Sequence, residues 1–300
     1  MGWRIIYIEE ANRINYKLNS IGINHKEEIV WISLDEIDMI IIESQSCNTS
    51  IKLLTELSKK GINVLLCGDT HMPIGMLTSI NNNQRTAKYN RLQMEWKNEI
   101  KQIVWTKIIR HKILLQIGCL AKLNKPEKIS LLKSYIGEIK KGDITNREGL
   151  SAKVYFHELF GLDFVRKRNA EDIINGSLNY IYQVIRAKLA QEILAHGYLP
   201  TIGIFHSSEY NYFGLADDFI EVYRPILDYY VIKLINEEEV TFLTPYFKEK
   251  LLNILYKYVW YNNSKHKIIE SIRLFVVSIT DNITNSEVEN LIFPYFYEEN

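Results

Sequence analysis

The sequence predicts an α+β protein, in which a small β-rich N-terminal domain is followed by a larger all-α C-terminal domain. Runs rich in Ile and Tyr, broken by turn residues, dominate residues 1–73. A polar, Asn-rich stretch follows at 79–85, and beyond it the apolar residues recur with helical spacing. We therefore expect domains at 1–80 and 86–300, with any catalytic site in the second.

The N-terminal elements begin with four runs that are typical of strands, namely GWRIIYI, INYKL, IVWISL and DMIIIES. We expect these runs to form a small antiparallel sheet. The apolar period changes at 49–60, which predicts an amphipathic helix that stops at Gly61. The next run, INVLLCG, predicts a buried strand that ends in the turn DTHMP. No strand is expected beyond Pro73.

Helical periodicity then continues almost to the C-terminus. The first helical segment is long and extends through Trp96 to Ile108. Later helices are expected near 126–139, 145–160, 177–196, 215–236, 245–260 and 266–279. The aromatic final run, NLIFPYFYEEN, is too short to form a domain, so we expect it to pack on the body of the protein or on a partner.

Composition argues against several classes of protein. The chain has 300 residues, of which 47% are hydrophobic, enough for a sizeable core. No apolar stretch approaches the roughly 18 residues of a membrane span, and no secretory signal opens the chain. Its three cysteines are widely spaced, which fits neither a disulfide framework nor a zinc site. We expect a cytoplasmic protein with no membrane partner.

Charge is distributed unevenly, although the formal net charge is zero. Residues 1–84 sum to −3, residues 85–141 to +10 and residues 142–300 to −7. The basic middle segment is suited to a nucleic acid, whereas the acidic remainder is suited to a cation. Many surface Lys and Arg residues are merely solvated, so this pattern alone does not establish a DNA partner.

The stretch GIFHSSEYNYFGLADDFIEVYRP, at 203–225, brings one histidine close to three carboxylates. Helical spacing places Glu221 on the same face as Asp217 and Asp218, where like charges repel unless a cation offsets them. The alternative is that Asp217 and Asp218 only complement the dipole at a helix N-terminus. His206, in the preceding loop, is either a loop residue without function or a group folded back over the start of the helix.

A further carboxylate lies in DITNREGLSAKVYFHELFG, at 143–161. Thr145 and Glu148 have the spacing of a capping box, so Glu148 is either part of a helix cap or a ligand, and spacing does not decide between them. A histidine nitrogen with two or three carboxylates suits Mn²⁺ or Mg²⁺ with open positions for water or phosphate oxygens. A structural zinc site would need more Cys or His.

Four ordered segments carry a resemblance to a known family: NREGLSAKVYFHELFG, NGSLNYIYQVIRAKLA, LPTIGIFH and LADDFIEVYRP. Together they resemble the integrase of the CRISPR adaptation machinery, the first-numbered Cas protein family, and most closely its type II form. The motifs cover about the last two-thirds of the chain. A departure at Phe205, where many type II relatives have histidine, bears on the subtype rather than on any ligand.

The resemblance implies a metal site with Mn²⁺ or Mg²⁺ as cofactor. Its catalytic residues and metal ligands would be Glu148, His206 and Glu221, with Asp218 as an auxiliary acid. Among the basic residues near this site we expect phosphate contacts from Arg147, Arg168 and Arg186.

The resemblance also implies function and partners. The protein would join the 3′-OH ends of captured double-stranded DNA to a CRISPR repeat by transesterification. It would act as a homodimer, through its N-terminal domain, with a small ferredoxin-like partner, the second-numbered Cas protein. The type II effector nuclease and an accessory adaptation protein are further expected partners. Two alternatives are a non-catalytic DNA-binding architectural subunit and a stand-alone metal-dependent nuclease of branched DNA.

Overall fold

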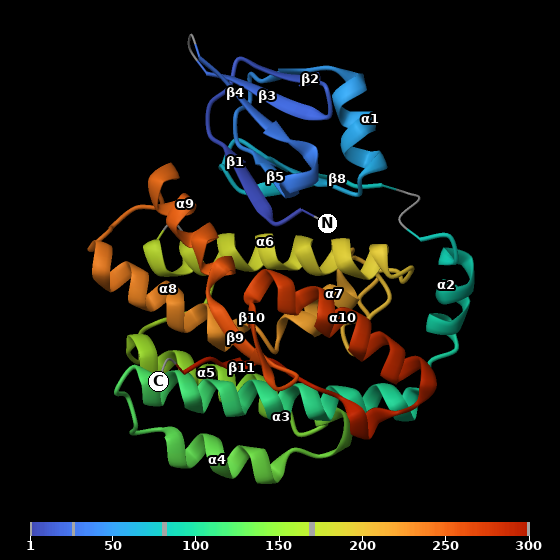
Figure 1. Ribbon diagram of the computed structural model, residues 1–300. Coiled ribbons are helices and arrows are strands. Elements are labelled where there is room, and N and C mark those ends of the chain that lie inside the picture. Colours follow the sequence, from blue (N-terminus) through green and yellow to red (C-terminus); the bar gives the residue numbers. More distant parts are fainter. Residues whose placement is uncertain (1, 26–27, 80–82, 168–171, 299–300) are drawn as a thin grey trace. The chain divides into compact units, whose positions relative to one another are not determined.

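The computed structural model describes residues 2–25, 28–79, 83–167 and 172–298. These residues form two compact units, Met1–Gln84 and Arg85–Asn300. Figure 1 shows that strands dominate the first unit and helices the second, which confirms the predicted fold class. The division lies at the end of the Asn-rich stretch.

The N-terminal unit contains two four-stranded sheets. One has the order β1-β5-β7-β8, with β8 antiparallel to β7 and the other pairs parallel. The other has the order β4-β3-β2-β6, antiparallel except for the pair β2 and β6. The strands are β1 (Arg4–Ile8), β2 (Arg13–Lys17), β3 (Ser20–His25), β4 (Glu28–Ser33), β5 (Ile37–Ile42), β6 (Asn48–Thr49), β7 (Asn63–Cys67) and β8 (Pro73–Leu77).

The expected single antiparallel sheet is therefore wrong. Helix α1 (Ile51–Lys59) lies in the crossover between β5 and β7, and a crossover of this length lets two strands pair in parallel. The helix begins as predicted, with the Ser50 hydroxyl accepting from the Leu53 amide, and Leu53 and Leu57 are buried in the core. The expectation of no strand beyond Pro73 is also wrong, since β8 begins at that residue.

The C-terminal unit is built on two long helices, α3 and α6. Helix α3 packs against α4, α5 and α8, and helix α6 packs against α7, α8, α9 and α10. Most of α6 is buried, so it forms the centre of this core. The helices are α2 (Thr86–Met94), α3 (Asn98–Lys122), α4 (Ile129–Glu138), α5 (Arg147–Phe160), α6 (Ile173–Ala195), α7 (Gly214–Ile220), α8 (Arg224–Glu238), α9 (Pro245–Leu252) and α10 (Ile268–Asn285).

A small sheet interrupts this helical unit, and the sequence analysis missed it. The order of its strands is β10-β9-β11, with bounds Tyr258–Tyr261 for β9, Ser264–Lys267 for β10 and Tyr295–Phe296 for β11. The helix expected over 245–260 ends at Leu252. Two features favour the hairpin: side chains alternate between exposed and buried along β9, and Asn262 and Asn263 form its turn at positive φ. The aromatic C-terminal run thus packs on the body, through β11.

The helix expected over 215–236 is also two helices. Helix α7 ends at Ile220, and α8 begins at Arg224 with Pro225 in its first turn, where the missing proline N–H is tolerated. Glu221 lies at the break between the two helices and is 3% exposed. The break places this carboxylate at the junction of α7 and α8.

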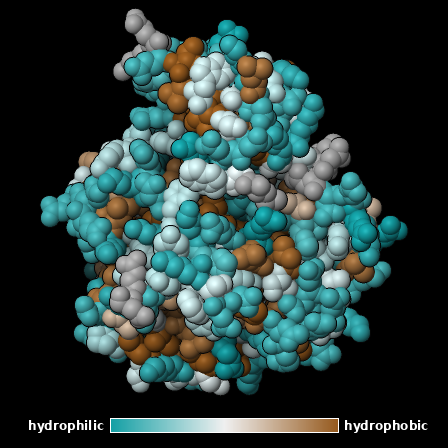
Figure 2. Space-filling view, viewed as in Figure 1, coloured by the Kyte–Doolittle hydropathy of each residue, from teal (hydrophilic) through white to brown (hydrophobic). Residues whose placement is uncertain are grey.

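No helix in the described part of the chain is long and apolar enough to cross a membrane. The surface in Figure 2 is mostly hydrophilic, with scattered apolar areas, one of them in the region where Figure 1 places α3 and α4.

Candidate active site

The site is organised around Lys112, a lysine buried in the middle of α3. The buried stripe of this helix includes Trp105, Ile108, Lys112, Gln116 and Cys119, whose spacings of three and four place them on one face. Only 5% of the Lys112 side chain is exposed. A buried ammonium is costly unless carboxylates surround it, so Lys112 must have anionic partners.

Glu148 is the first of these partners and lies in the first turn of α5. It does not form the capping box that its spacing from Thr145 suggests. Asp143 caps the helix instead, because its carboxylate accepts from the amides of Arg147 and Glu148, each at 2.9 Å. The Thr145 hydroxyl donates to the Glu138 carbonyl oxygen. The Glu148 carboxylate is therefore free to pair with Lys112.

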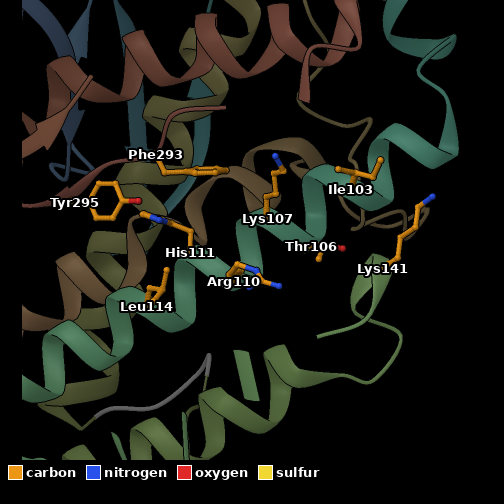
Figure 3. Close-up of a pocket in the computed structure, with 9 residues that line it drawn as sticks. All are labelled: Ile103, Thr106, Lys107, Arg110, His111, Leu114, Lys141, Phe293 and Tyr295. Carbon is orange, nitrogen blue, oxygen red and sulfur yellow. The ribbon is translucent and has the colours of Figure 1, made fainter. Parts of the chain in front are cut away.

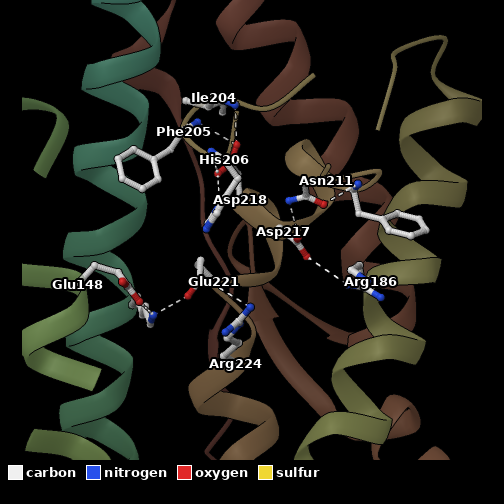
Figure 4. Close-up of polar contacts among 12 residues, drawn as sticks. Glu148, Arg186, Ile204, Phe205, His206, Asn211, Asp217, Asp218, Glu221 and Arg224 are labelled. Carbon is white, nitrogen blue, oxygen red and sulfur yellow. Dashed lines mark hydrogen bonds and ion pairs between the residues drawn. The ribbon is translucent and has the colours of Figure 1, made fainter. Parts of the chain in front are cut away.

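Glu221 approaches Lys112 from the break between α7 and α8. Its Oε2 lies 2.5 Å from Lys112 Nζ, and its Oε1 lies 3.2 Å from a guanidinium nitrogen of Arg224. Burial alone would raise the pKa of Glu221, but Arg224 and Lys112 outweigh it and hold the pKa below its usual value. Burial opposes the charge of Lys112 in the same way, and Glu221 and Glu148 raise its pKa overall. Figure 4 shows the two carboxylates converging on one cation.

His206 is held beside these carboxylates by Asp218. Asp218 is fully buried and accepts from His206 Nδ1 at 2.7 Å. Its carboxylate also accepts from three consecutive loop amides, those of Ile204, Phe205 and His206. The bond to Asp218 raises the pKa of His206, against the effect of burial, and the charge of Glu221 adds to the rise. Asp218 thus fixes the ring and leaves Nε2 available for a ligand or a proton.

The loop that carries His206 depends on glycine and on an aromatic stack. A Cβ on Gly203 would lie 2.5 Å from the His206 carbonyl oxygen and 2.7 Å from Asp218 Oδ2. The Phe205 ring stacks on Trp105 of α3, with centroids 4.3 Å apart and planes 5° apart. The departure from histidine at position 205 therefore anchors the loop to α3.

The remaining predicted residues have other partners. Asp217 accepts from Asn211 Nδ2 at 2.9 Å and lies 3.9 Å from Arg186, whose guanidinium also covers the Phe213 ring. Arg147 pairs with Glu138 at 2.8 Å. Arg168 lies outside the described residues. Arg147 and Arg186 must therefore exchange internal partners to contact a phosphate.

A cavity of about 390 Å³ adjoins Glu148 and Lys112. Glu148 and Lys112 line one side of it, and the guanidinium groups of Arg166 and Arg224 lie over the ring of Tyr182, at 5.4 and 5.0 Å from its centroid. The Tyr182 hydroxyl donates to Asp228, a buried acid that also lines the cavity. Sequence reasoning gave Arg224, Tyr182 and Asp228 no role. The sequence does contain a signal for Lys112. A lysine on the apolar face of a helix needs an anionic partner when that face is buried.

The side chains of Glu148, Glu221 and His206 have the chemistry to bind a divalent cation, although the Lys112 ammonium lies between the two carboxylates. Among the described residues, no group of three or more His, Cys, Asp or Glu side chains lies close enough together to hold a metal ion. However, Glu221 Oε2 is buried and pairs with the Lys112 ammonium at 2.5 Å, and this ion pair is the contact that a cation would replace. Two carboxylates with a nearby, oriented imidazole suit Mn²⁺ or Mg²⁺.

The chain is similar to one known protein family along most of its length. The family described as CRISPR associated protein Cas1 matches residues 6–258. The CRISPR-associated endonuclease Cas1 of Neisseria meningitidis serogroup C (strain 8013) is 31% identical, over 98% of this chain and 96% of its own.

Solved structures share the fold. A Cas1 protein from Thermotoga maritima gives a TM-score of 0.77 at 14% identity, covering 99% of this chain and 100% of its own. A casposase bound to integration product gives 0.76 at 20% identity, covering 95% and 91%. A Cas6-RT-Cas1–Cas2 complex gives 0.79 at 16% identity, covering 100% of this chain and 36% of that one. By its sequence, this chain belongs to the Cas1 family of CRISPR-associated proteins.

Proposed function

We propose that this protein is a metal-dependent DNA integrase of CRISPR adaptation, with associated endonuclease activity. The observation that carries the proposal is the convergence of Glu148, from α5, and Glu221, from the break between α7 and α8, on one buried cation beside His206. The endonuclease name of the Neisseria relative supports the activity. The casposase on its integration product and the complex that contains Cas2 support strand joining and a Cas2 partner.

The proposed reaction exchanges one phosphodiester for another. The 3′-OH of a captured duplex attacks a phosphate of the repeat, a new 3′-oxygen–phosphorus bond forms, and the bond to the former 3′ oxygen breaks and releases a 3′-OH. A bound Mn²⁺ or Mg²⁺ would lower the pKa of the attacking hydroxyl and neutralise charge on the phosphate. No nucleotide hydrolysis is needed.

The residues of this chain have separate roles in that reaction. Glu148, Glu221 and His206 would hold the ion, and Asp218 orients His206 through Nδ1. Metal binding would require Lys112 to leave its place between the carboxylates, and its ammonium would then be released to pair with a phosphate. Arg166 and Arg224, held over Tyr182, supply further positive charge at the wall of the cavity. We propose double-stranded DNA, a second copy of this chain and Cas2 as partners.

The test is strand transfer of a short duplex into a plasmid that carries a CRISPR repeat, with Cas2 and with Mn²⁺, Mg²⁺ or EDTA. Wild type is compared with Glu148→Gln, His206→Ala and Glu221→Gln, and Glu158→Gln on the same helix as Glu148 is the matched control. We expect metal-dependent joining that each site variant reduces at least 100-fold, about 3 kcal/mol of barrier, and that a 3′-deoxy end abolishes.

Three outcomes would replace this proposal. Joining by all variants alike, with EDTA present, would make the carboxylates structural, and DNA binding without joining under any metal condition would favour the architectural subunit. Cleavage of branched DNA by the chain alone, with no joining when Cas2 is added, would favour the stand-alone nuclease.

A further inference from the structure

The small sheet of the C-terminal unit has an aromatic outer face. Along β9, Tyr258 and Trp260 are exposed while the intervening Val259 is buried. The register places Lys265 of β10 and Tyr295 of β11 directly beside Trp260. Residues opposite each other on neighbouring strands share a face, so these side chains form one surface. Trp260 is 43% exposed and Tyr295 is 49% exposed.

Lysine side chains lie among these rings. Lys265 Nζ is 3.9 Å from the ring centroid of Tyr258 and 4.4 Å from that of Tyr297. Tyr297 in turn lies nearly parallel to Trp260, with centroids 6.4 Å apart and planes 24° apart. Half-exposed rings with an ammonium between them offer both stacking and positive charge at one place.

A cavity of about 640 Å³ continues this face on the other side of Tyr295. Figure 3 shows Tyr295 and Phe293 at one end of it and the side chains of α3 along its length. The lining residues include three cations and no carboxylate. They are Ile103, Thr106, Lys107, Arg110, His111, Leu114, Lys141, Phe293 and Tyr295.

The charge of the cavity is available to a ligand. Lys107 pairs with Glu289 at 2.6 Å and Lys141 with Glu99 at 2.9 Å, but both carboxylate side chains are largely exposed, at 85% and 72%. Such surface pairs contribute little, so a bound anion displaces them readily. In the described part of the chain, Arg110 makes no ion pair.

The C-terminal segment is held firmly against α3 at this place. His111 Nε2 lies 2.7 Å from the Pro294 carbonyl oxygen, and the His111 ring stacks on Phe293 with centroids 4.9 Å apart. Burial lowers the pKa of His111 to about 4, so this histidine is neutral at pH 7. The aromatic rings therefore stand on a fixed support rather than on a loose tail.

This surface is separate from the carboxylates of the active site. Residues 103, 107, 110 and 114 lie on one face of α3, and at 100° per residue Lys112 is turned about 200° from Arg110. The cavity at Arg110 and the cavity at Lys112 share no lining residue. We call Tyr258, Trp260, Tyr295, Tyr297, Lys265 and Arg110 the aromatic-cationic surface.

We propose that the aromatic-cationic surface binds a segment of single-stranded DNA, with unpaired bases stacked on Trp260 and Tyr295 and phosphates at Arg110 and Lys265. Stacking platforms combined with a basic groove bind single strands with little sequence preference, because every base has an aromatic face and every nucleotide a phosphate. A duplex hides its base faces and so gains only the phosphate contacts. The proposal goes beyond strand joining, since it uses none of the catalytic side chains.

The test is fluorescence anisotropy with a labelled 12-nucleotide oligo(dT) and, separately, a 12-base-pair duplex, in the presence of EDTA. For Trp260→Ala and Tyr295→Ala we expect oligo(dT) affinity to fall on the order of tenfold, and duplex affinity to change less than twofold. Trp260→Phe keeps a stacking ring and should retain most of the binding. Arg110→Ala should lower the salt slope for oligo(dT) by about 0.7.

Control variants are Phe242→Ala, whose ring is 73% exposed outside this surface, and Lys233→Ala on α8. Glu221→Gln should leave oligo(dT) binding intact while it reduces joining, so failure of the integrase proposal and failure of this one are distinguishable. Unchanged oligo(dT) affinity in Tyr295→Ala and Arg110→Ala, both on exposed side chains, would overturn the proposal even if Trp260→Ala did not fold. Equal losses for oligo(dT) and duplex would overturn it too, and a partner protein would then be the better occupant.

Discussion

Lys112 Nζ lies 2.5 Å from Glu221 Oε2 and also pairs with Glu148, so one buried ammonium joins the carboxylate of α5 to the one at the break between α7 and α8. This cation offsets the repulsion between the two carboxylates, one of which, Glu221, is buried. In the proposed function a divalent ion would bind the same two glutamates, so the Lys112 ammonium would have to leave before the ion enters.

Lys112→Met should therefore destabilise the fold in EDTA and be rescued by Mn²⁺. Removing one partner of a buried pair costs about 3 kcal/mol or more at pH 7, because Glu148 loses its ion pair and Glu221 keeps only Arg224. A metal ion that replaces the ammonium should restore the melting temperature, and more strongly than it raises that of wild type. Thermal melts with and without Mn²⁺ measure both effects.

Lys188→Met is the matched control for this experiment. Lys188 pairs with Glu192 at 2.6 Å, and both side chains are at most 5% exposed. This variant should lose stability through the same mechanism without regaining it in Mn²⁺. Equal Mn²⁺ shifts in the two variants would show that the rescue is not specific to Glu148 and Glu221.

Asp143, rather than Thr145, should control the start of α5. Asp143→Asn keeps the shape of the side chain but loses one of the oxygens that accept from the amides of Arg147 and Glu148, so we expect a loss of about 1 kcal/mol. Thr145→Val removes one bond to the Glu138 carbonyl and should change stability by less than about 0.5 kcal/mol. Urea unfolding of both variants measures the two losses. A larger loss for Thr145→Val would show that Thr145, rather than Asp143, caps the helix.

Gly203 should be needed for the position of His206. A Cβ at this residue would meet the His206 carbonyl oxygen and Asp218 Oδ2, both at less than 3 Å, so Gly203→Ala must displace the loop. We expect a loss of about 2 kcal/mol in stability together with reduced strand transfer. Gly137→Ala, in helix α4 with no atom within 4 Å of the new Cβ, should instead gain up to about 1 kcal/mol. A Gly203→Ala melting temperature equal to that of wild type would contradict the predicted loss of stability.

Local spacing predicts the strand-rich N-terminal unit and the helical C-terminal unit. The choice of Glu148, Glu221 and His206 as one site comes instead from the resemblance of their motifs to a known family. What spacing could not supply was the partner of each group. The role of Lys112 depends on three helices meeting, and the capping by Asp143 depends on a left-handed backbone at Asn146.

A second error was the single helix expected over 245–260, which in the structure is a helix followed by a strand. The run Tyr258–Tyr261 followed a helix and was assigned to it, although Asn262 and Asn263 form a hairpin turn. The parallel pairing of β5 and β7 depends on where α1 returns the chain, which no local pattern encodes. Both are cases in which tertiary pairing overrides a local preference.

Asp228 should make the stability of the protein depend on pH. Burial raises the pKa of this carboxyl from 3.8 to about 6, although hydroxyl donors from Tyr182 and Tyr155 partly oppose the rise. The folded state holds the proton more tightly than the unfolded state does. The contribution of protonated Asp228 to the free energy of unfolding is therefore complete below pH 4 and is lost as pH rises through about 6. The loss amounts to about 3 kcal/mol.

Asp228→Asn is neutral at every pH and should remove this dependence. We expect its unfolding free energy to change less than that of wild type between pH 4.5 and 7.5, and to be equal or higher at pH 7.5. Tyr155→Phe removes a donor to the charged carboxylate, so its loss should be greater at pH 7.5 than at pH 5. Urea titrations at four pH values measure these slopes. If the curves of wild type and Asp228→Asn run parallel, Asp228 does not titrate in this range, and the cavity wall behind Arg166 and Arg224 carries a fixed charge.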